Sequence, residues 1–234
     1  LQGGASNTLD APYYHFDGSD DYIRTAAMAN SEFYLSIVCW AKNTNGTVSG
    51  NEDTMVARYT GATNLRCWSF GIMEDSKMYT RHGNSGGNIQ YNTSAAVFTD
   101  CDQWHMYVSV FDNGDVTFYR DGIEVASTET GNDNATLHSY STEELTIGAM
   151  GDNSNPWEGD ISDVKLFNNA LTATEVKSLY SGGSVPFKYK GASQTAVHDS
   201  DFSAGADSWV DAYTSQLTTE GNIDSIGGQD NNLR

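Results

Sequence analysis

The run WHMYVSVFDNGDVTFYRDGIEVAS, residues 104–127, carries the clearest structural pattern in the chain. Apolar residues alternate with more polar ones at its start, which is the period of a β-strand that buries one face. These apolar residues are Trp104, Met106, Val108 and Val110. Asn113-Gly114 supplies the positive φ angles of a tight hairpin turn, the chain returns over residues 116–120, and Asp121-Gly122 turns it again. The run therefore predicts a three-stranded antiparallel meander.

Weaker strand patterns occur elsewhere, separated by turn-rich segments. The predicted strands cover residues 33–42, 54–59, 67–73, 77–81 and 145–148. One helix is predicted: Thr172 stands at its N-cap, Glu175 at the capping-box position, and Gly182-Gly183 ends it. Many short strands with one brief helix predict an all-β fold built as a two-sheet antiparallel sandwich.

Two further segments combine a strand-like pattern with aspartates. They are FDGSDDYI, residues 16–23, and GDISDVKLFNNALTATEV, residues 159–176. If both lie in one sheet, the fold is closed by joining its ends, and carboxylates from distant points in the sequence meet.

The net charge restricts the classes of partner. The chain has 31 acidic and 12 basic residues, a formal net charge of −19. So few Lys and Arg residues release few counterions from a phosphate backbone, which argues against a nucleic-acid partner. The acidity fits cation binding, and it fits simple solvation of the surface at least as well. No apolar run is long enough to cross a membrane, so no membrane insertion is expected.

The cysteine pattern leaves two alternatives open. Cys39, Cys67 and Cys101 have no spacing typical of a metal site. Either one disulfide forms beside one free thiol, or all three are buried thiols, which is the more economical interpretation.

Five segments, in this order along the chain, resemble the laminin G-like members of the concanavalin A-like jelly-roll superfamily. They are FDGSDDYI, FYLSIVCWAK, QWHMYVSVFDNGDVTFYRDGIEV, LTIGAMG and GDISDVKLFNNALTATEVKSLY. The resemblance covers about residues 13–181. It implies two curved antiparallel sheets of six or seven strands each, with the first and last strands adjacent. Members are mostly binding modules for carbohydrates, glycosaminoglycans or proteins, found in extracellular proteins, secreted bacterial enzymes and phage virion proteins.

The resemblance also implies a structural calcium ion that fastens the two ends of the domain. Calcium needs six to eight oxygen ligands, which carboxylates and turn carbonyls supply. The expected ligands are Asp17, Gly18 and Asp163, with Asp160 as a possible addition. The alternative is that these aspartates only cap turns and solvate the sheet edge.

A carbohydrate site needs exposed aromatic rings beside polar side chains. The candidate ligand-binding rings are Trp68, Tyr79, Tyr91 and Trp157. Core packing or anchoring of a loop is the alternative for each of them. Trp40 and Trp104 are assigned to the core because they lie within the clearest strand patterns.

Patterns that indicate catalysis are absent from the sequence. The histidines form no spaced pair, and no Glu-x-Asp-x-Glu strand places two carboxylates on one face, as glycoside hydrolysis on this fold requires. Glu143-Glu144 are adjacent and would point to opposite faces of a strand. The sequence therefore predicts a protein that is not an enzyme.

The expected domain organisation is a jelly roll over residues 1–184, a linker over 185–196, and a third segment over 197–234. Residues 200–222, SDFSAGADSWVDAYTSQLTTEGN, resemble the opening of a carbohydrate-binding-module β-sandwich. The third segment is interpreted as the truncated start of that sandwich; the alternative is a polar tail of the first domain. Because the chain starts without methionine, it is expected to be an excerpt of a longer protein.

The favoured function is a non-catalytic binding or decoration module, carbohydrate-binding or adhesive, within a larger extracellular or phage virion protein. Its expected partners are a glycan or neighbouring structural subunits, and its expected location is extracellular or on the virion surface. One alternative is a purely structural protein–protein contact domain of a phage capsid or tail. The other is a polysaccharide lyase or hydrolase.

Overall fold

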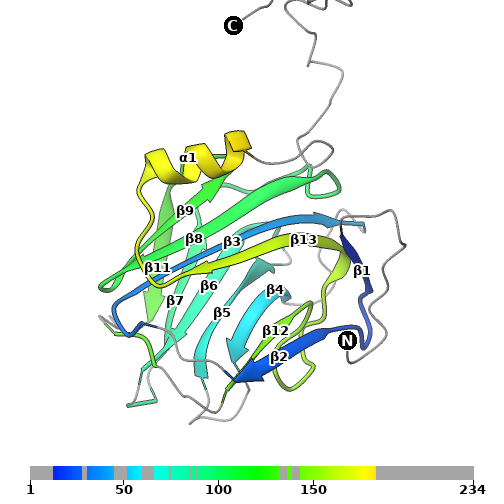
Figure 1. Cartoon of the computed structure of the whole chain (residues 1–234), viewed down its shortest axis with the longest axis horizontal. Helices are drawn as coiled ribbons and strands as arrows, with labels where there is room; N and C mark the ends of the chain where they lie inside the picture. The colour runs from blue at the N-terminus through cyan, green and yellow to red at the C-terminus, as the bar shows by residue number, and fades with distance from the viewer. Residues whose placement is uncertain are drawn as a thin grey trace, which may run out of the picture. The chain divides into compact units, whose positions relative to one another are not determined.

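Within the residues that it describes, the computed structural model forms two antiparallel β-sheets and one short helix (Figure 1). It describes residues 13–27, 31–44, 52–59, 66–73, 75–84, 86–87, 89–131, 136–138 and 143–182. The predicted linker and the predicted third segment lie outside these residues. The predicted all-β two-sheet sandwich is confirmed.

One sheet has six strands and the other has seven, as the resemblance implies. The six-stranded sheet has the order β1 (Tyr14–Asp17), β13 (Glu158–Phe167), β3 (Tyr34–Asn43), β8 (His105–Asp112), β9 (Asp115–Arg120) and β10 (Ile123–Val125). The seven-stranded sheet has the order β11 (Ser127–Gly131), β7 (Ile89–Ser94), β6 (Met78–Gly83), β5 (Arg66–Met73), β4 (Glu52–Tyr59), β12 (Glu144–Ile147) and β2 (Ile23–Ala27). The predicted meander is β8, β9 and β10, with antiparallel pairing throughout.

The first and last strands lie side by side, as predicted. β1 pairs antiparallel with β13, so that Tyr14 lies opposite Ile161 and Asp17 lies opposite Glu158. β13 in turn pairs with β3, which places β13 inside the six-stranded sheet. The two ends of the domain are therefore held together by a backbone ladder.

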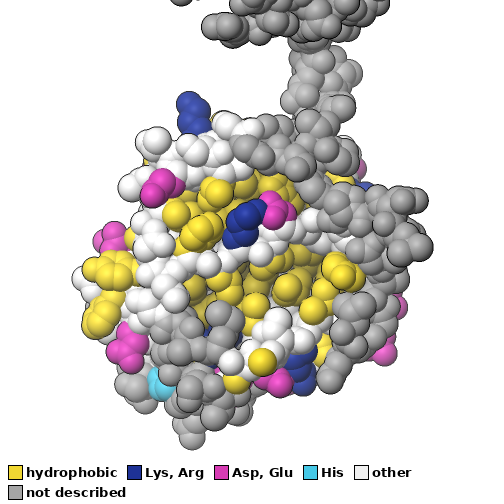
Figure 2. Space-filling view, viewed as in Figure 1, with side chains coloured by type: hydrophobic (Ala, Val, Ile, Leu, Met, Phe, Trp, Pro, Cys, Tyr) yellow, Lys and Arg dark blue, Asp and Glu magenta, His cyan; other side chains and the backbone are white. Residues whose placement is uncertain are grey.

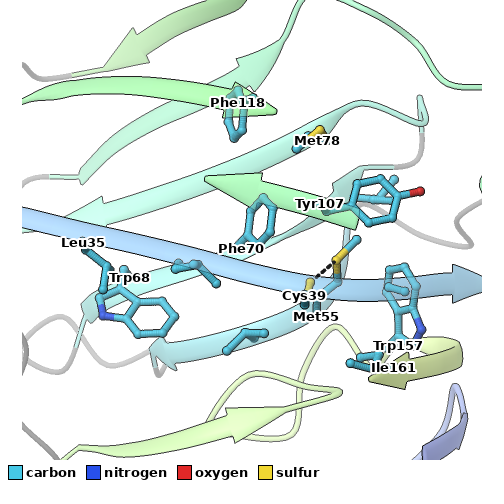
Figure 3. Close-up of a cluster of buried hydrophobic side chains, with 14 of the residues drawn as sticks. Leu35, Cys39, Met55, Trp68, Phe70, Met78, Tyr107, Phe118, Trp157 and Ile161 are labelled. Carbon is cyan, nitrogen blue, oxygen red and sulfur yellow. Dashed lines mark hydrogen bonds between the residues drawn. The ribbon is translucent and has the colours of Figure 1, made fainter. Parts of the chain in front are cut away.

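A hydrophobic core fills the space between the two sheets (Figure 3). Trp68 on β5 and Trp157 beside β13 are both fully buried in it, and Phe70 stacks near Phe118 with 6.4 Å between ring centroids. Burial of such large rings provides most of the favourable free energy of folding in a sandwich of this kind. The core thus includes two of the rings that the sequence offered as ligand-binding candidates.

The three cysteines are free and buried, so of the two alternatives the structure supports three thiols. Cys39 Sγ lies 3.3 Å from Met55 Sδ, across the two sheets (Figure 3). Burial raises the pKa of the Cys39 and Cys101 thiols. Because the thiolate is the reactive form, these buried thiols are inert.

Strand β8 is buried on both faces, whereas the sequence predicted that only one face would be. Tyr107 points to the core between the sheets, and Val108 belongs to a second apolar cluster. Helix α1 (Ala173–Gly182) contributes Val176 to that second cluster, and the Tyr180 ring stacks on Trp40 with 5.7 Å between centroids. A strand pattern reports alternation but does not reveal that a distant helix covers the outer face.

The start of α1 has the predicted capping box. Thr172 donates its backbone N–H and its hydroxyl to Glu175 Oε2, at 2.7 and 2.8 Å, and the Glu175 N–H donates to Thr172 Oγ1 at 3.3 Å. These bonds satisfy polar groups that the first helical turn leaves unpaired. They fix the point at which the helix begins.

Hydrophobic side chains gather over the middle of the face shown in Figure 2, with single acidic and basic side chains among them. The exposed large hydrophobic residues in the described part of the chain are Phe33, Tyr34, Val97 and Ile123.

No helix within the described residues has the length and apolar character needed to span a membrane.

Candidate functional site

The register of the seven-stranded sheet places polar and aromatic side chains together on its outer face. Residues directly opposite one another share a face, and these pairs connect β4, β5, β6 and β7. They are Glu52 with Met73, Thr54 with Gly71, Gly71 with Tyr79, Tyr79 with Thr93, and Arg81 with Tyr91. Their chain neighbours Phe70, Ile72 and Met78 belong to the core. Because side chains alternate along a strand, the paired set lies on the face away from the core.

Arg81 is the centre of this face. Its guanidinium carbon lies 5.4 Å from the ring centroid of Tyr91, 5.9 Å from that of Tyr79 and 6.0 Å from that of Tyr59. Its Nη2 forms an ion pair with Glu52 Oε1. We call Glu52, Tyr59, Tyr79, Arg81, Tyr91 and Asn155 the Arg81 cluster.

The Tyr79 ring lies across β5 because residue 71 is glycine. A Cβ atom at Gly71 would be 2.9 Å from Cε1 of Tyr79, too close for a real contact. The ring passes over this gap, and the Tyr79 hydroxyl lies 2.9 Å from Thr54 Oγ1 on β4. Tyr91 follows on β7, with its ring 6.1 Å from the Tyr79 ring at an interplanar angle of 30°.

A loop between β12 and β13 adds Asn155 to the cluster. The Asn155 side-chain amide donates to Glu52 Oε2 at 3.0 Å, and the Asn155 backbone carbonyl accepts the Thr54 N–H at 3.0 Å. The loop is also fixed to β4 by the Gly148 N–H, which donates to the Met55 carbonyl at 3.0 Å. Backbone bonds at both ends of the loop therefore hold this amide in place.

Burial is the main cause of the raised pKa values of Glu52 and Tyr91 in the cluster. Burial raises the pKa of Glu52, and the Arg81 charge partly offsets this. Burial also raises the pKa of Tyr91, with the Glu52 charge as the next cause, so the Tyr91 hydroxyl remains protonated at neutral pH. The Glu52 side chain is 4% exposed and that of Arg81 is 27% exposed, so a ligand can reach the Arg81 side chain more readily than the Glu52 carboxylate.

The structure brings Tyr79 and Tyr91 together and separates them from Trp68 and Trp157. Trp68, Tyr79 and Trp157 are 0% exposed, whereas Tyr91 is partly exposed. A fully buried ring has no face on which a sugar could stack, so this burial corrects the expectation that the first three present open rings. Tyr79 is therefore a buried member of the cluster that packs beside Arg81 and Tyr91. Tyr91 stays a candidate for direct contact with a ligand.

Sequence reasoning missed four members of the cluster: Glu52, Tyr59, Arg81 and Asn155. One signal was available, since Tyr79 and Arg81 are two residues apart on a strand and so share a face. The other members had no such signal. Glu52 and Asn155 are 103 residues apart, and only tertiary pairing joins them.

The acidic loop after β1 forms a second candidate site. Carboxylate oxygens of Asp17, Asp20 and Asp21 lie within 4.8 Å of one another. Asp21 Oδ2 accepts the Asp17 N–H at 3.0 Å, and Asp17 Oδ1 accepts the Ser19 N–H at 2.8 Å. Gly18 lies at the turn, against the Glu158 side chain. An all-oxygen donor set of this kind fits a hard cation such as calcium.

Asp160 and Asp163 do not join this loop, which corrects the predicted ligand set. Asp163 is five residues beyond Glu158, the partner of Asp17, so it lies about 15 Å away along β13. It forms an ion pair with Lys165 instead. Asp160 is buried, with Oδ1 2.8 Å from His15 Nδ1 and Oδ2 3.0 Å from Lys42 Nζ, so both of its oxygens already have basic partners.

Comparisons with solved structures agree with the fold. Domain 4 of AbnA, an extracellular GH43 arabinanase from Geobacillus stearothermophilus solved with arabinotriose, has 19% identity and a TM-score of 0.54, over 77% of this chain and 82% of that one. A heptameric SAP-like pentraxin from Limulus polyphemus has 15% identity and a TM-score of 0.54, over 71% and 80%.

The receptor binding domain of botulinum neurotoxin C/D mosaic serotype has 16% identity and a TM-score of 0.58 over 77% of this chain. The match spans 45% of that toxin domain's length. At these identities the likeness is one of fold. A search of curated proteins gives no match.

The family comparison is more specific. The model of the Laminin_G_3 family, described as the concanavalin A-like lectin/glucanases superfamily, matches residues 17–177. This range runs from the end of β1 into helix α1 and includes both candidate sites. The chain therefore belongs to the concanavalin A-like lectin/glucanases superfamily, as a laminin G-like jelly roll.

Proposed function

We propose that this domain is a non-catalytic carbohydrate-binding module and that the Arg81 cluster is its binding site. The carrying observation is a partly exposed Arg81 side chain whose guanidinium lies among three tyrosine rings, with a buried carboxylate and a fixed amide beside it. The Tyr91 ring, which is partly exposed, can pack against the apolar face of a sugar, and the polar groups around it bond to hydroxyls. The similar arabinanase domain was solved with arabinotriose, which supports a glycan as the ligand.

The arrangement of carboxylates supports a binding role over hydrolysis. Glu52 and Asp53 are adjacent on β4, so they point to opposite faces of the sheet. Glu52 faces Arg81 on the outer face, and Asp53 bonds to Asn43 of the other sheet. Glycoside hydrolysis needs two carboxyl groups on the same side, about 5–10 Å apart around the scissile bond. This neighbouring pair does not meet that requirement.

Removal of Arg81 or Tyr91 is expected to weaken glycan binding. Arg81→Met keeps much of the side-chain volume and removes the charge and donors, and Tyr91→Ala removes the most accessible ring. Because stacking and charged hydrogen bonds each contribute about 1–3 kcal/mol, we expect a loss of affinity of about five- to 150-fold for each variant. The measurement is a glycan-array screen followed by calorimetry on the best ligand.

The matched control is Tyr34→Ala, which removes a 43% exposed tyrosine from the other sheet. We expect this variant to keep wild-type affinity. Binding that Arg81→Met and Tyr91→Ala leave unchanged would move the site elsewhere on the domain. No binding to any glycan by the wild-type protein would contradict the proposed function itself.

We further propose that a structural calcium ion binds the loop of Asp17, Gly18, Asp20 and Asp21. The ion would neutralise the clustered carboxylates and fasten β1, whose strand pairs with β13. Millimolar calcium is expected to raise the melting temperature of the wild-type protein, and a chelator to lower it again, because a ligand of the folded state stabilises that state.

Asp20→Asn tests this assignment, because Asp20 is exposed and belongs to the acidic group. It is expected to lose the calcium response, and Asp163→Asn is expected to keep it. Both variants remove one exposed carboxylate, so the comparison separates the loop from general charge effects. An equal response to calcium in both variants would place the ion elsewhere or nowhere.

A second part of the proposal concerns the protein that contains this domain. We propose that it belongs to a larger extracellular or phage virion protein, where it binds glycan or a neighbouring structural subunit. One observation favours the alternative of a protein–protein contact domain: Phe33 and Tyr34 are 45% and 43% exposed and lie next to each other. Loss of self-association or partner capture in Phe33→Ala, with glycan binding absent, would favour that alternative.

A further inference from the structure

The charge of Arg81 is paired within its own cluster. The Arg81 side chain is partly exposed, and its counter-charge, Glu52, lies buried beside it. The charge of Asp75 contributes to the raised pKa of Tyr91. Asp75 itself forms an ion pair with Lys77, with 2.7 Å between Lys77 Nζ and Asp75 Oδ2.

Arg66 adds a second guanidinium beside the cluster, 6.0 Å from the Tyr59 ring centroid, so the cancellation holds at Arg81 itself and not over the whole face. A ligand that bonds to Arg81 therefore meets a guanidinium that already has an anionic partner.

Resting on the proposed glycan site, we infer that the Arg81 cluster selects uncharged sugars over sugars that carry carboxylate or sulfate groups, and that Glu52 sets this selectivity. Glu52 accepts from Arg81, from Tyr91 at 3.3 Å and from Asn155 at 3.0 Å. These partners fix the carboxylate in place, so it remains behind the guanidinium when a ligand arrives. Glu52 thus acts through Arg81, as a positioning residue.

The physical reason is competition for one guanidinium. An acidic sugar group that bonds to Arg81 must share it with Glu52, and the two anions then lie close together in a partly desolvated site. Like charges at such a distance repel strongly where water is scarce. A sugar hydroxyl bonds to the same guanidinium without this repulsion. The total charge of −19 adds a long-range repulsion of its own, but salt screens that contribution.

The test uses one oligosaccharide in two forms. The neutral glycan that binds best on the array is compared with the same glycan after oxidation of its primary hydroxyls to carboxylates. We expect the wild-type protein to bind the oxidised form at least tenfold more weakly, both at 0.15 M and at 1 M NaCl. At 1 M NaCl the Debye length is about 3 Å, so the long-range field of the whole chain is screened. A preference for the neutral glycan that persists at 1 M NaCl must therefore come from the local repulsion at Arg81.

Glu52→Gln tests the residue. The amide has the shape of the carboxylate, and its oxygen still accepts from Arg81. Its NH2 group replaces the oxygen that accepted from Asn155, and a turn of the Asn155 side-chain amide restores that bond, so the sheet face is expected to fold as before. Without the buried charge, Arg81 becomes an unpaired cation, and the ratio of neutral to oxidised affinity is expected to fall about tenfold. Glu124→Gln is the matched control, because Glu124 is exposed on β10 of the other sheet, and its removal changes the net charge equally.

Each outcome decides between the claims. Equal or tighter wild-type binding of the oxidised glycan overturns the selectivity and leaves the glycan site standing. An unchanged ratio in Glu52→Gln, or an equal change in Glu124→Gln, overturns the role of Glu52. If Glu52→Gln does not fold, the wild-type ratio at 1 M salt remains the deciding measurement. A wild-type protein that binds neither form contradicts the proposed function and this inference together.

Discussion

Replacement of Phe16 with alanine is expected to lower the free energy of unfolding by about 3–5 kcal/mol. Phe16 is fully buried although β1 is an edge strand of four residues. Its ring lies against Gly148: a Cβ atom at Gly148 would be 2.3 Å from two carbons of the ring. Loss of the ring leaves a cavity that this short strand and the adjoining turn are too constrained to fill. Urea unfolding, with the slope compared between variants, measures the effect.

Phe33→Ala is the matched control, because it removes the same ring from a position that is 45% exposed. We expect a change below about 1 kcal/mol there. If Phe16→Ala and Phe33→Ala cost the same, the Phe16 ring is not part of the core in solution.

The contact with Gly148 provides a second check on the same prediction. Gly148→Ala alone is expected to destabilise the wild-type protein, because the methyl group has no room and φ is +89°. In the Phe16→Ala background the cavity receives the methyl group, and only the backbone strain remains. The two substitutions are therefore expected to be non-additive by at least about 1 kcal/mol. Strict additivity would show that the two residues are not in contact.

Asp53→Asn is expected to stabilise the protein by about 2 kcal/mol at pH 8 and by almost nothing at pH 4. Asp53 is buried at one end of the sandwich and accepts a hydrogen bond from Asn43 Nδ2 at 3.0 Å, across the two sheets. Burial, with a smaller contribution from the Glu158 charge, raises the pKa of Asp53 from 3.8 to about 7. At about 1.36 kcal/mol per pKa unit the upper limit is about 4 kcal/mol, which relaxation around the charge reduces.

The direction of the pH dependence follows from proton binding. Between about pH 4 and pH 7 the folded protein keeps the Asp53 proton and the unfolded chain loses it, so stability falls as the pH rises through this window. Asparagine cannot ionise, so its advantage grows over the same window and then levels off. Unfolding curves at a series of pH values measure it.

Asp115→Asn serves as the control for net charge, since Asp115 is exposed at the start of β9. It is expected to shift stability by a small amount that does not depend on pH. A pH-independent gain in Asp53→Asn would mean that the Asp53 carboxyl titrates normally in the folded protein.

Local patterns were sufficient where one strand or turn sets its own structure. The alternation and the Asn113-Gly114 turn predicted β8 and β9, and the capping box at Thr172 and Glu175 predicted the start of α1. The resemblance to the laminin G-like family predicted that the ends of the domain pair, which β1 and β13 confirm. Each of these features depends on residues within a few positions of one another, or on a resemblance that covers the whole domain.

Local patterns failed where the answer depends on which strands are neighbours. Asp163 was expected near Asp17, but the register offsets them by five residues. Trp68 and Trp157 were candidates for an open site, but they face the core. A two-residue period states which side chains share a face, and it cannot state which face another sheet or helix covers.

The amino-acid sequence alone determined the all-β class, the meander and the capped helix, because alternation, turn residues and caps act over short stretches of chain. The joining of the two ends was implied by the resemblance of the whole domain to a family. Only the tertiary structure decided that Arg81 lies among Tyr59, Tyr79 and Tyr91, above Glu52 and beside Asn155. Those residues come from three strands and a distant loop. The hydrogen-bond register of a sheet, which is fixed by burial of the whole core, is what brings such positions within contact.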